Sequence, residues 1–348
     1  MFADNNQISG KQLFCQMTLG LLGAMILFLP GREILGIRGA IACGIALLCL
    51  LIHCFWLTRL APVYGHLEKY VGRPVAVGTG LVYLAYYILT GAFVIALIGK
   101  MISYYMILKT PLFLVHLVTI LTCAMAGTPK IQRRGRMAEF CLPFFIALLF
   151  IMMALAFWQN KSHFSGYLLE KREIDVDTIL QDTEILLLSF TCINGVPFLL
   201  GRVKEKRFIS LAVGTGTVLA FVAGAMLLLQ GCYGQAQTEA RSWPMLSLMA
   251  GIRISDGTVS RMDPIWIALL MMFLLFSVGS TFFYGNYIVQ QTRLGIPWYV
   301  IYGLVFVISL LQVGEMCIAE YYILCVRYFF APVMLLWNGY LIFKKYTL

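Results

Sequence analysis

Charged side chains are scarce in this sequence. Only 12% of its 348 residues are Asp, Glu, Lys or Arg, whereas 61% are hydrophobic and the mean hydropathy is +0.85. Soluble domains carry roughly 25% charged residues, about twice that share. The composition therefore excludes an ordinary soluble domain and predicts a protein that crosses the membrane many times.

The sequence also lacks the motifs of common catalytic and metal sites. Its ten cysteines are scattered, mostly within apolar runs, and no CxxC pair or Cys/His cluster occurs. This spacing supports neither a zinc site nor a disulfide framework, although Cys232 and Cys317 could both lie near the outer face and form one bridge. We find no nucleophile–base pair, metal-ligand set or phosphate-binding loop. We therefore expect neither an enzyme nor a cofactor.

No polar linker or low-complexity stretch divides the chain, so residues 1–348 are expected to form one transmembrane domain. A helix needs about 20 apolar residues to cross the hydrocarbon core. The predicted fold is an all-α integral membrane protein with ten transmembrane helices. The ten segments, of which the fourth and ninth are short, are Gln12–Leu29, Gly36–Leu57, Val75–Met106, Leu112–Ala126, Ala138–Trp158, Ile179–Leu200, Phe208–Cys232, Ile265–Val289, Trp298–Val313 and Tyr321–Phe343.

Positive charge is unevenly distributed between the two sets of loops. With ten crossings both termini share one side, where the loops hold 15 Lys and Arg residues against nine in the opposite loops. Because basic loops stay in the cytoplasm, we predict a multi-pass inner-membrane protein of the cell or spore with both termini cytoplasmic. The basic stretch 130–136, which includes Arg134, is expected at that surface against lipid headgroups. The net charge of +10 then needs no nucleic-acid partner.

Two of the apolar segments are interrupted at corresponding places. Glycines and Pro30 interrupt the first span, and Gly195 and Pro197 interrupt the sixth. Lipid cannot satisfy the backbone groups of an unwound turn, so such a turn must face protein or a wet cavity. One interruption opens each half, which predicts a 5+5 inverted repeat (approximately 8–159 and 179–345) with broken first and sixth helices. This pattern is typical of a transporter binding site near the bilayer midplane.

Several short strings are spread along the chain: Ile8-Ser-Gly-Lys-Gln-Leu-Phe14, Gly23-Ala-Met-Ile-Leu-Phe-Leu-Pro30, Leu108-Lys-Thr-Pro-Leu112, Arg136-Met-Ala-Glu-Phe-Cys-Leu-Pro143, Trp243-Pro-Met-Leu246 and Arg261-Met-Asp-Pro264. Their order and spacing resemble the B subunits of spore germinant receptors, which belong to the amino acid–polyamine–organocation (APC) transporter superfamily. The resemblance implies a LeuT-like fold. It also implies a membrane subunit that senses a small nutrient, often an amino acid, together with a larger A subunit and a lipoprotein C subunit.

One position departs from that family. Many relatives carry a Gly-aromatic-Glu string in the sixth helix, where this chain reads Cys192-Ile-Asn-Gly195. The carboxylate that could bind a ligand amine or carry a proton is therefore missing.

The two interruptions supply the first candidate ligand-binding groups. Unwound N–H groups near Gly20 and Gly23 could bind a ligand carboxylate, and the alternative is close helix packing of small residues. Backbone carbonyls of the sixth helix, with Asn194, could hold an ammonium group. There the alternative is that Ser189 and Thr191 bond back to their own helix. A Gly23→Leu change is expected to fill the pocket and abolish the ligand response.

In the related fold the third and eighth helices flank the site, and here they carry aromatic and hydroxyl side chains. Ordinary helix packing is the alternative interpretation for each of these side chains. The complete candidate ligand-binding set is Gly20, Gly23, Ala24, Met25, Tyr87, Thr90, Ser189, Thr191, Asn194, Gly195, Ser277 and Ser280.

Four further polar residues lie within apolar runs. Lys100 and Arg327 are close to the predicted outer face, where long side chains can snorkel to the headgroups. His53 and His116 have no partner at a useful spacing, so we interpret them as structural residues.

Three functions stay open at this point. The leading hypothesis is a germinant-receptor B subunit that binds an amino-acid-like nutrient at the broken helices and signals to its A and C partners. The second is a secondary transporter (permease) of an amino acid or amine, and the third is a structural subunit with a vestigial pocket. Glu139, Asp182 and Glu184 lie near predicted helix ends, which favours a sensor over a proton-coupled transporter.

Overall fold

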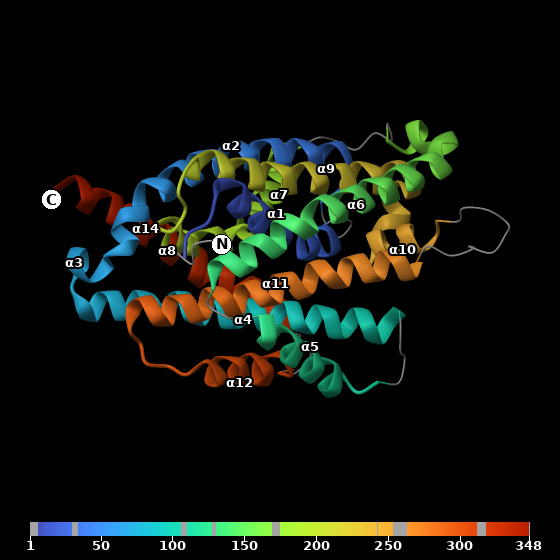
Figure 1. Ribbon diagram of the computed structural model, residues 1–348. Coiled ribbons are helices and arrows are strands. Elements are labelled where there is room, and N and C mark those ends of the chain that lie inside the picture. Colours follow the sequence, from blue (N-terminus) through green and yellow to red (C-terminus); the bar gives the residue numbers. More distant parts are fainter. Residues whose placement is uncertain are drawn as a thin grey trace.

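The computed structural model describes residues 6–29, 34–105, 110–126, 130–168, 175–241, 243–252, 263–311 and 318–347. These residues form a bundle of helices (Figure 1). Its elements are α1 (Gly10–Phe28), α2 (Gly36–Gly65), α3 (Leu67–Val71), α4 (Arg73–Tyr105), α5 (Leu112–Ala126), α6 (Ile131–Leu168), α7 (Val176–Ser189), η1 (Thr191–Gly195), α8 (Pro197–Leu200), α9 (Arg207–Glu239), α10 (Pro244–Ala250), α11 (Asp263–Thr292), α12 (Trp298–Ser309), α13 (Ile318–Cys325), η2 (Val326–Phe330) and α14 (Ala331–Thr347).

The helices have the length and apolarity of membrane spans. Eight described helical segments are long and apolar enough to cross a bilayer, and two shorter apolar helices cover Leu112–Ala124 and Trp298–Ser309. These two correspond to the short fourth and ninth segments expected from the sequence. Large apolar side chains such as Phe140 and Leu336 are exposed on the outside of the bundle, as lipid contact requires. The chain is therefore an all-α, multi-pass membrane protein, while ten crossings and the inverted repeat stay predictions.

The first helix is not broken where the sequence predicted. α1 begins at a capping box, in which the Ser9 hydroxyl accepts from Gln12 N–H and the Gln12 side chain accepts from Ser9 N–H. It then runs without interruption to Phe28, so the N–H groups near Gly20 stay within the helix. Each glycine costs a helix only about 1 kcal/mol, and α1 is supported on several sides by α6, α9 and α11. Pro30 lies outside the described residues.

The second interruption occurs where it was predicted. α7 ends at Ser189, the tighter 3₁₀ turn η1 follows, and α8 starts at Pro197, whose ring has no N–H to continue a helix. The Tyr87 hydroxyl donates to the Cys192 carbonyl at 3.0 Å. A side chain at Gly195 would collide with that same hydroxyl, so the turn and Tyr87 fit together only because residue 195 is glycine.

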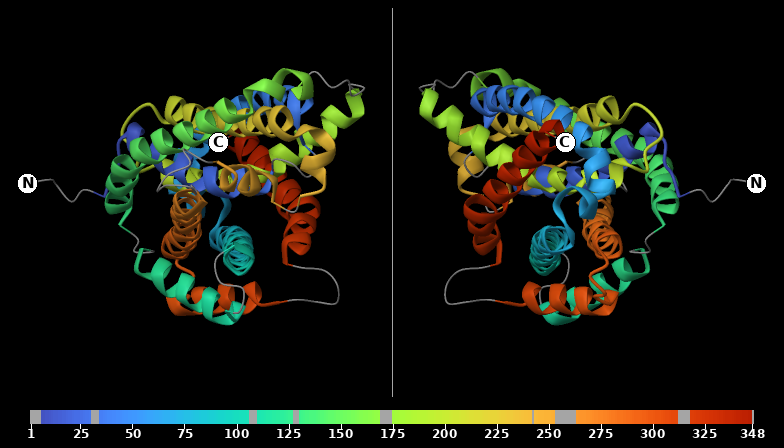
Figure 2. Two further views of the ribbon diagram at one scale, coloured as in Figure 1. Left: turned by 90° about the vertical axis from the view of Figure 1, so that its right-hand side faces the viewer. Right: turned by 90° about the vertical axis from the view of Figure 1, so that its left-hand side faces the viewer.

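The bundle is layered, with α1 near its middle. Figure 1 shows α2 and α9 at one edge and α5 and α12 at the opposite edge, and α1 contacts both α9 and α11. The end-on views of Figure 2 show α5 and α12 as an outer layer beside α4 and α11. α1 is therefore enclosed by other helices, which explains why a cavity beside it can be shielded from lipid.

Segments that the sequence placed at one membrane face do meet in space. Ile8 N–H donates to the Arg202 carbonyl (3.0 Å) and Lys204 N–H donates to the Ile8 carbonyl (3.1 Å). At the other terminus, Lys345 Nζ donates to the Arg59 carbonyl at 2.7 Å. These contacts join the loops that were grouped together, and the assignment of that face to the cytoplasm stays a prediction.

Candidate functional site

A cavity of about 360 Å³ lies in the centre of the bundle. Its wall is formed by α1, α4, the end of α7 with η1, α11, and α13 with η2, and Arg134 of α6 closes one end. Small-molecule sites typically occupy about 300–1,000 Å³ and are mostly apolar with a few polar groups. The cavity is of this kind, so it is the candidate ligand site.

Two small residues of α1 form one wall of the cavity. From Cys15 to Leu27 every residue is buried except Gly20 and Ala24, which are half-buried and line the cavity. They are four residues apart and so share one face of the helix. A Cβ at Gly20 would lie 3.2 Å from the Ser280 hydroxyl. The absence of bulk at these two positions therefore leaves space between α1 and α11.

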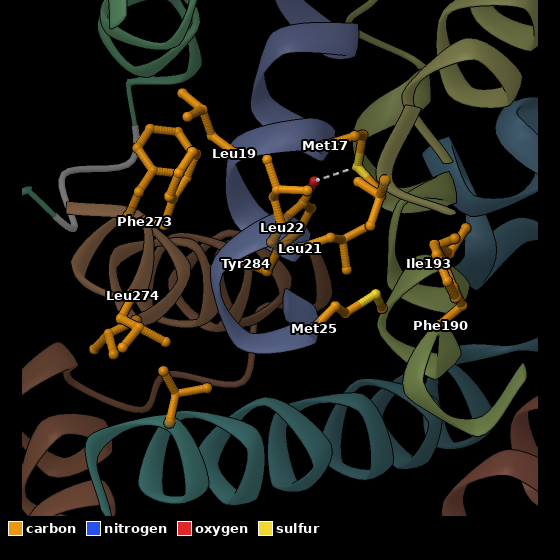
Figure 3. Packing of buried hydrophobic residues seen from close by; sticks show 14 of the residues in the cluster. Met17, Leu19, Leu21, Leu22, Met25, Phe190, Ile193, Phe273, Leu274 and Tyr284 are labelled. Atoms are coloured by element: carbon orange, nitrogen blue, oxygen red, sulfur yellow. Dashed lines mark hydrogen bonds between the residues drawn. The ribbon is translucent and has the colours of Figure 1, made fainter. Parts of the chain in front are cut away.

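Gly23 is on a different face of α1 from the cavity. Figure 3 shows Met25 on the side of α1 that faces η1, and Phe273 on the opposite side. A Cβ at Gly23 would collide with Phe273 of α11. The structure therefore corrects the expectation for Gly23→Leu, because added bulk there would push α1 from α11 rather than fill the cavity.

The structure brings eight of the twelve candidate residues into the cavity wall and leaves four outside it. Those in the wall are Gly20, Ala24, Met25, Tyr87, Thr90, Ser189, Ser277 and Ser280. Those outside it are Gly23, Thr191, Asn194 and Gly195. Their ligand contacts stay a prediction.

Asn194 faces away from the cavity into a buried polar network. Its amide oxygen accepts from Asn338 Nδ2 at 2.8 Å and lies 2.9 Å from His53 Nε2. Its Nδ2 donates to the Thr191 carbonyl at 3.0 Å, and the Tyr64 hydroxyl donates to Asn338 Oδ1 at 2.6 Å. Asn194 thus fastens η1 to α2 and α14. The network also gives His53 the partner that the sequence did not reveal.

Several serine and threonine hydroxyls in the wall donate to their own helices. Thr90 donates to the Tyr86 carbonyl (2.8 Å) and Ser189 to the Ile185 carbonyl (2.9 Å). This is the alternative interpretation weighed for Ser189. Each oxygen retains lone pairs for an additional donor. These hydroxyls can therefore accept a hydrogen bond from a ligand even while their own protons are used.

Aromatic stacking shapes the wall between α4 and α11. The rings of Tyr87 and Tyr284 are stacked with their centroids 5.3 Å apart and their planes at 8°. Figure 3 shows the Tyr284 hydroxyl directed to the Met17 sulfur of α1. Tyr87 belongs to α4, its ring contacts α11 and its hydroxyl contacts η1, so it connects three parts of the cavity wall.

Arg134 is the main functional candidate that sequence reasoning placed wrongly. It was expected at the membrane surface, yet it is only 7% exposed and lines the cavity. Its Nη2 donates to the Phe276 carbonyl at 2.8 Å and to the Ser280 hydroxyl, and its guanidinium lies 4.1 Å above the Phe276 ring. The neighbouring Arg133 is exposed. A signal was present, because Ile131, Arg134 and Ala138 recur at the spacing of one buried helix face.

Gln16 is the second residue that the sequence analysis did not single out. It is 4% exposed, it lines the cavity, and neither atom of its amide has a hydrogen-bond partner among the residues described. Gln16 lies one helical turn before Gly20, on the face of α1 that carries Gly20 and Ala24. That spacing was the available signal.

Three carboxylates of the described bundle each form an ion pair with a basic side chain. Arg327, which also lines the cavity, has its Nη2 2.7 Å from Glu184 Oε2. Asp182 pairs with Arg38 at 2.7 Å, and Glu139 pairs with Lys11 at 2.9 Å. The structure gives Arg327 a carboxylate partner on α7, and its expected snorkelling to the headgroups stays a prediction.

Comparison with known proteins places the chain in a family. Residues 7–314 match the family model described as spore germination protein. The chain is also similar to spore germination protein YndE of Bacillus subtilis strain 168, with 21% identity over 253 residues that cover 72% of this chain and 68% of YndE. The family match extends over the described helices from α1 to α12 and therefore includes most of the cavity wall. The chain belongs to the spore germination protein family.

Proposed function

We propose that this protein is the nutrient-sensing membrane subunit of a spore germinant receptor, and that it binds a small amino-acid-like germinant in the central cavity. The family match supports the role in germination. The observation that carries the binding function is the cavity itself, which lies between the helices, is largely apolar and is lined by a few convergent polar groups.

The contacts around η1 supply a route from the cavity to the rest of the bundle. Tyr87 lines the cavity and bonds η1 through the Cys192 carbonyl. η1 in turn is fastened to α2 and α14 by the Asn194 network. A ligand can bias two conformations only through different contacts in each. In our proposal the ligand alters the Tyr87–η1 contact, and the A and C partner subunits respond to the resulting movement.

The proposed arrangement in the membrane follows the predicted topology. Both termini are cytoplasmic, so the Arg327–Glu184 end of the cavity is nearer the outer face and the Arg134 end is nearer the cytoplasm. The inverted repeat relates residues 8–159 to residues 179–345, although the continuous α1 and the interrupted α7–η1–α8 segment differ.

A permease for an amino acid or amine is the second candidate function. The break at η1, directly beside the cavity, is the observation that favours it. Against proton coupling, the three carboxylates Glu139, Asp182 and Glu184 are each held in an ion pair. A sensor needs no proton-carrying carboxylate, so these ion pairs favour the sensor over a proton-coupled permease.

A cavity-filling variant tests the proposed function. Ala24→Leu adds bulk to the wall, whereas the matched Ala147→Leu adds the same bulk at an exposed position of α6. We expect Ala24→Leu to abolish nutrient-triggered germination in spores that carry the A and C subunits, and Ala147→Leu to leave it intact. Equal germination in both variants would place the site elsewhere. Gradient-driven accumulation of an amino acid by vesicles that contain this chain alone would favour the permease.

A further inference from the structure

The charge of Arg134 is buried without a counter-charge. Its side chain is almost completely enclosed, and within the described parts of the chain its partners are the neutral Phe276 carbonyl, the Ser280 hydroxyl and the rings of Phe276 and Phe283. Glu139, one turn along the same helix, pairs with Lys11 instead. Buried charges are normally paired, and an ionisable group within the membrane is a functional candidate. The guanidinium therefore lacks an anion.

Gln16 independently indicates a missing partner at the same end of the cavity. A buried amide almost always has hydrogen bonds, yet neither the oxygen nor the nitrogen of Gln16 has one in the described structure. A Cβ on Gly135, the residue after Arg134, would lie 3.1 Å from Gln16 Nε2, so the amide and the guanidinium belong to one corner of the cavity. An occupant of this corner would satisfy both groups.

The backbone cannot supply the anion site that the sequence predicted. Because α1 continues as a helix through Gly20, its N–H groups there are not free for a ligand. The guanidinium of Arg134 has five N–H donors, and among the described residues Phe276 and Ser280 use only those on Nη2. Arg is also the residue best suited to bind a carboxylate with two parallel hydrogen bonds. Within the described structure the unpartnered donors beside Gly20 are thus side chains of α1 and α6, while the Tyr86 hydroxyl of α4 is a further unpartnered group in the wall.

We infer that Arg134 and Gln16 form the subsite for the anionic group of the ligand, and that this group is a carboxylate. The inference rests on the proposed function and adds the chemical class and orientation of the ligand. The carboxylate binds to Arg134 and to the Gln16 Nε2–H, and the remainder of the ligand extends along Gly20 and Ala24 into the apolar part of the cavity. The same compound with a carboxamide in place of the carboxylate has no negative charge and binds poorly.

The test compares acids with their carboxamides on the full chain in lipid nanodiscs. The probes are the proteinogenic amino acids and, for each, the α-carboxamide, with affinity measured by calorimetry. In the unmodified protein at least one acid should bind roughly ten- to hundredfold more tightly than its carboxamide. Arg134→Met should remove that preference, Arg134→Lys should retain part of it, and the control Arg133→Met, at the exposed neighbouring position, should leave it unchanged.

The outcomes separate this inference from the proposed function. If an acid and its carboxamide bind the unmodified protein equally well, the protein binds a nutrient but the anion subsite is wrong. If no probe of either set binds, both the amino-acid-like ligand and the subsite are wrong. A retained preference in Arg134→Met also overturns the subsite. If Arg134→Met fails to fold, Arg134→Lys decides the matter, because an undiminished preference for the acid in that variant would overturn the subsite.

Discussion

Two arginines border the central cavity, and their charges are balanced in different ways. Arg327 is 44% exposed and pairs with Glu184 at 2.7 Å, whereas Arg134 is 7% exposed and contacts only neutral groups among the described residues. An exposed ion pair contributes about 0–1 kcal/mol, so the Arg327 pair can be a structural contact. A buried, uncompensated charge is costly. In our inference the anionic group of a ligand supplies the counter-charge that Arg134, unlike Arg327, does not have among the described residues.

Gln16→Glu should produce the largest effect, because it would make the Arg134 end resemble the Arg327 end. The new carboxylate would neutralise Arg134 and repel a ligand carboxylate, which removes charge-assisted bonds of about 1.5–3 kcal/mol. We expect the germinant concentration for half-maximal germination to rise about tenfold or more. Gln237→Glu, an exposed position on α9, serves as the control and should leave that concentration unchanged. An unaltered germination response in Gln16→Glu would contradict the inference that Arg134, unlike Arg327, binds the carboxylate of the ligand.

The stability of the empty protein should rise when Arg134 is replaced by Met. Replacing a buried ion pair by apolar residues is often neutral or stabilises by about 1–4 kcal/mol, and Arg134 has no carboxylate partner among the described residues that its removal would leave unpaired. The Phe276 carbonyl would keep its bond from the Ser280 hydroxyl at 2.8 Å. Thermal unfolding of the ligand-free chain in detergent or nanodiscs measures this, with Arg133→Met as the neutral reference. A large loss of stability in Arg134→Met would show that Arg134 is a structural residue instead.

Gln16→Leu should weaken ligand binding less than the charge changes do. It removes one neutral hydrogen-bond donor, worth about 0.5–1.5 kcal/mol, and it also relieves the unpaired amide in the empty protein. We therefore expect a roughly two- to tenfold loss of affinity together with equal or higher thermal stability. If Gln16→Leu lowered the thermal stability and left the ligand affinity unchanged, the hydrogen-bond partner of Gln16 would be a group of the protein and not the ligand.

Breaking the Arg327–Glu184 pair should have the smallest effect. Because both side chains are more than 40% exposed, Arg327→Met and Glu184→Gln should each lower stability by no more than about 1 kcal/mol. Because salt screens charges that are in contact with water, that loss of stability should be smaller at high ionic strength. Unfolding at low and high ionic strength measures it. A larger loss of stability that did not depend on salt would show that the Arg327–Glu184 pair is shielded from water and contributes strongly to the fold.

The contrast between α1 and η1 shows what the sequence could and could not predict. Gly195 and Pro197 located the break correctly, because proline removes a backbone donor and the turn at Gly195 needs space for Tyr87. Glycines in α1 predicted a break that does not occur, because packing by α9 and α11 outweighs their low helix propensity. Local propensity alone cannot tell whether neighbouring helices will support a weak segment.

The cavity wall was predictable where the expected fold brings small and hydroxyl residues of different helices together. Small and hydroxyl residues such as Gly20 and Ser280 were identified because the fold brings their helices together. Arg134 was one of the Lys and Arg residues counted to predict the topology. Such a count treats all loop charges alike, so it could not show that the Arg134 side chain is buried in the cavity wall. Asn194 was polar and close to the break, yet its partners His53 and Asn338 lie on distant helices that no local pattern connects.

The most direct measurement is an experimental structure of the full chain in nanodiscs with a bound amino acid that triggers germination. The account predicts density for the ligand in the central cavity, with its carboxylate oxygens within about 3.2 Å of the Arg134 guanidinium and its side chain along Gly20 and Ala24. A ligand outside the cavity, or one whose carboxylate points to Arg327 with Arg134 still bound only to Phe276 and Ser280, would contradict it.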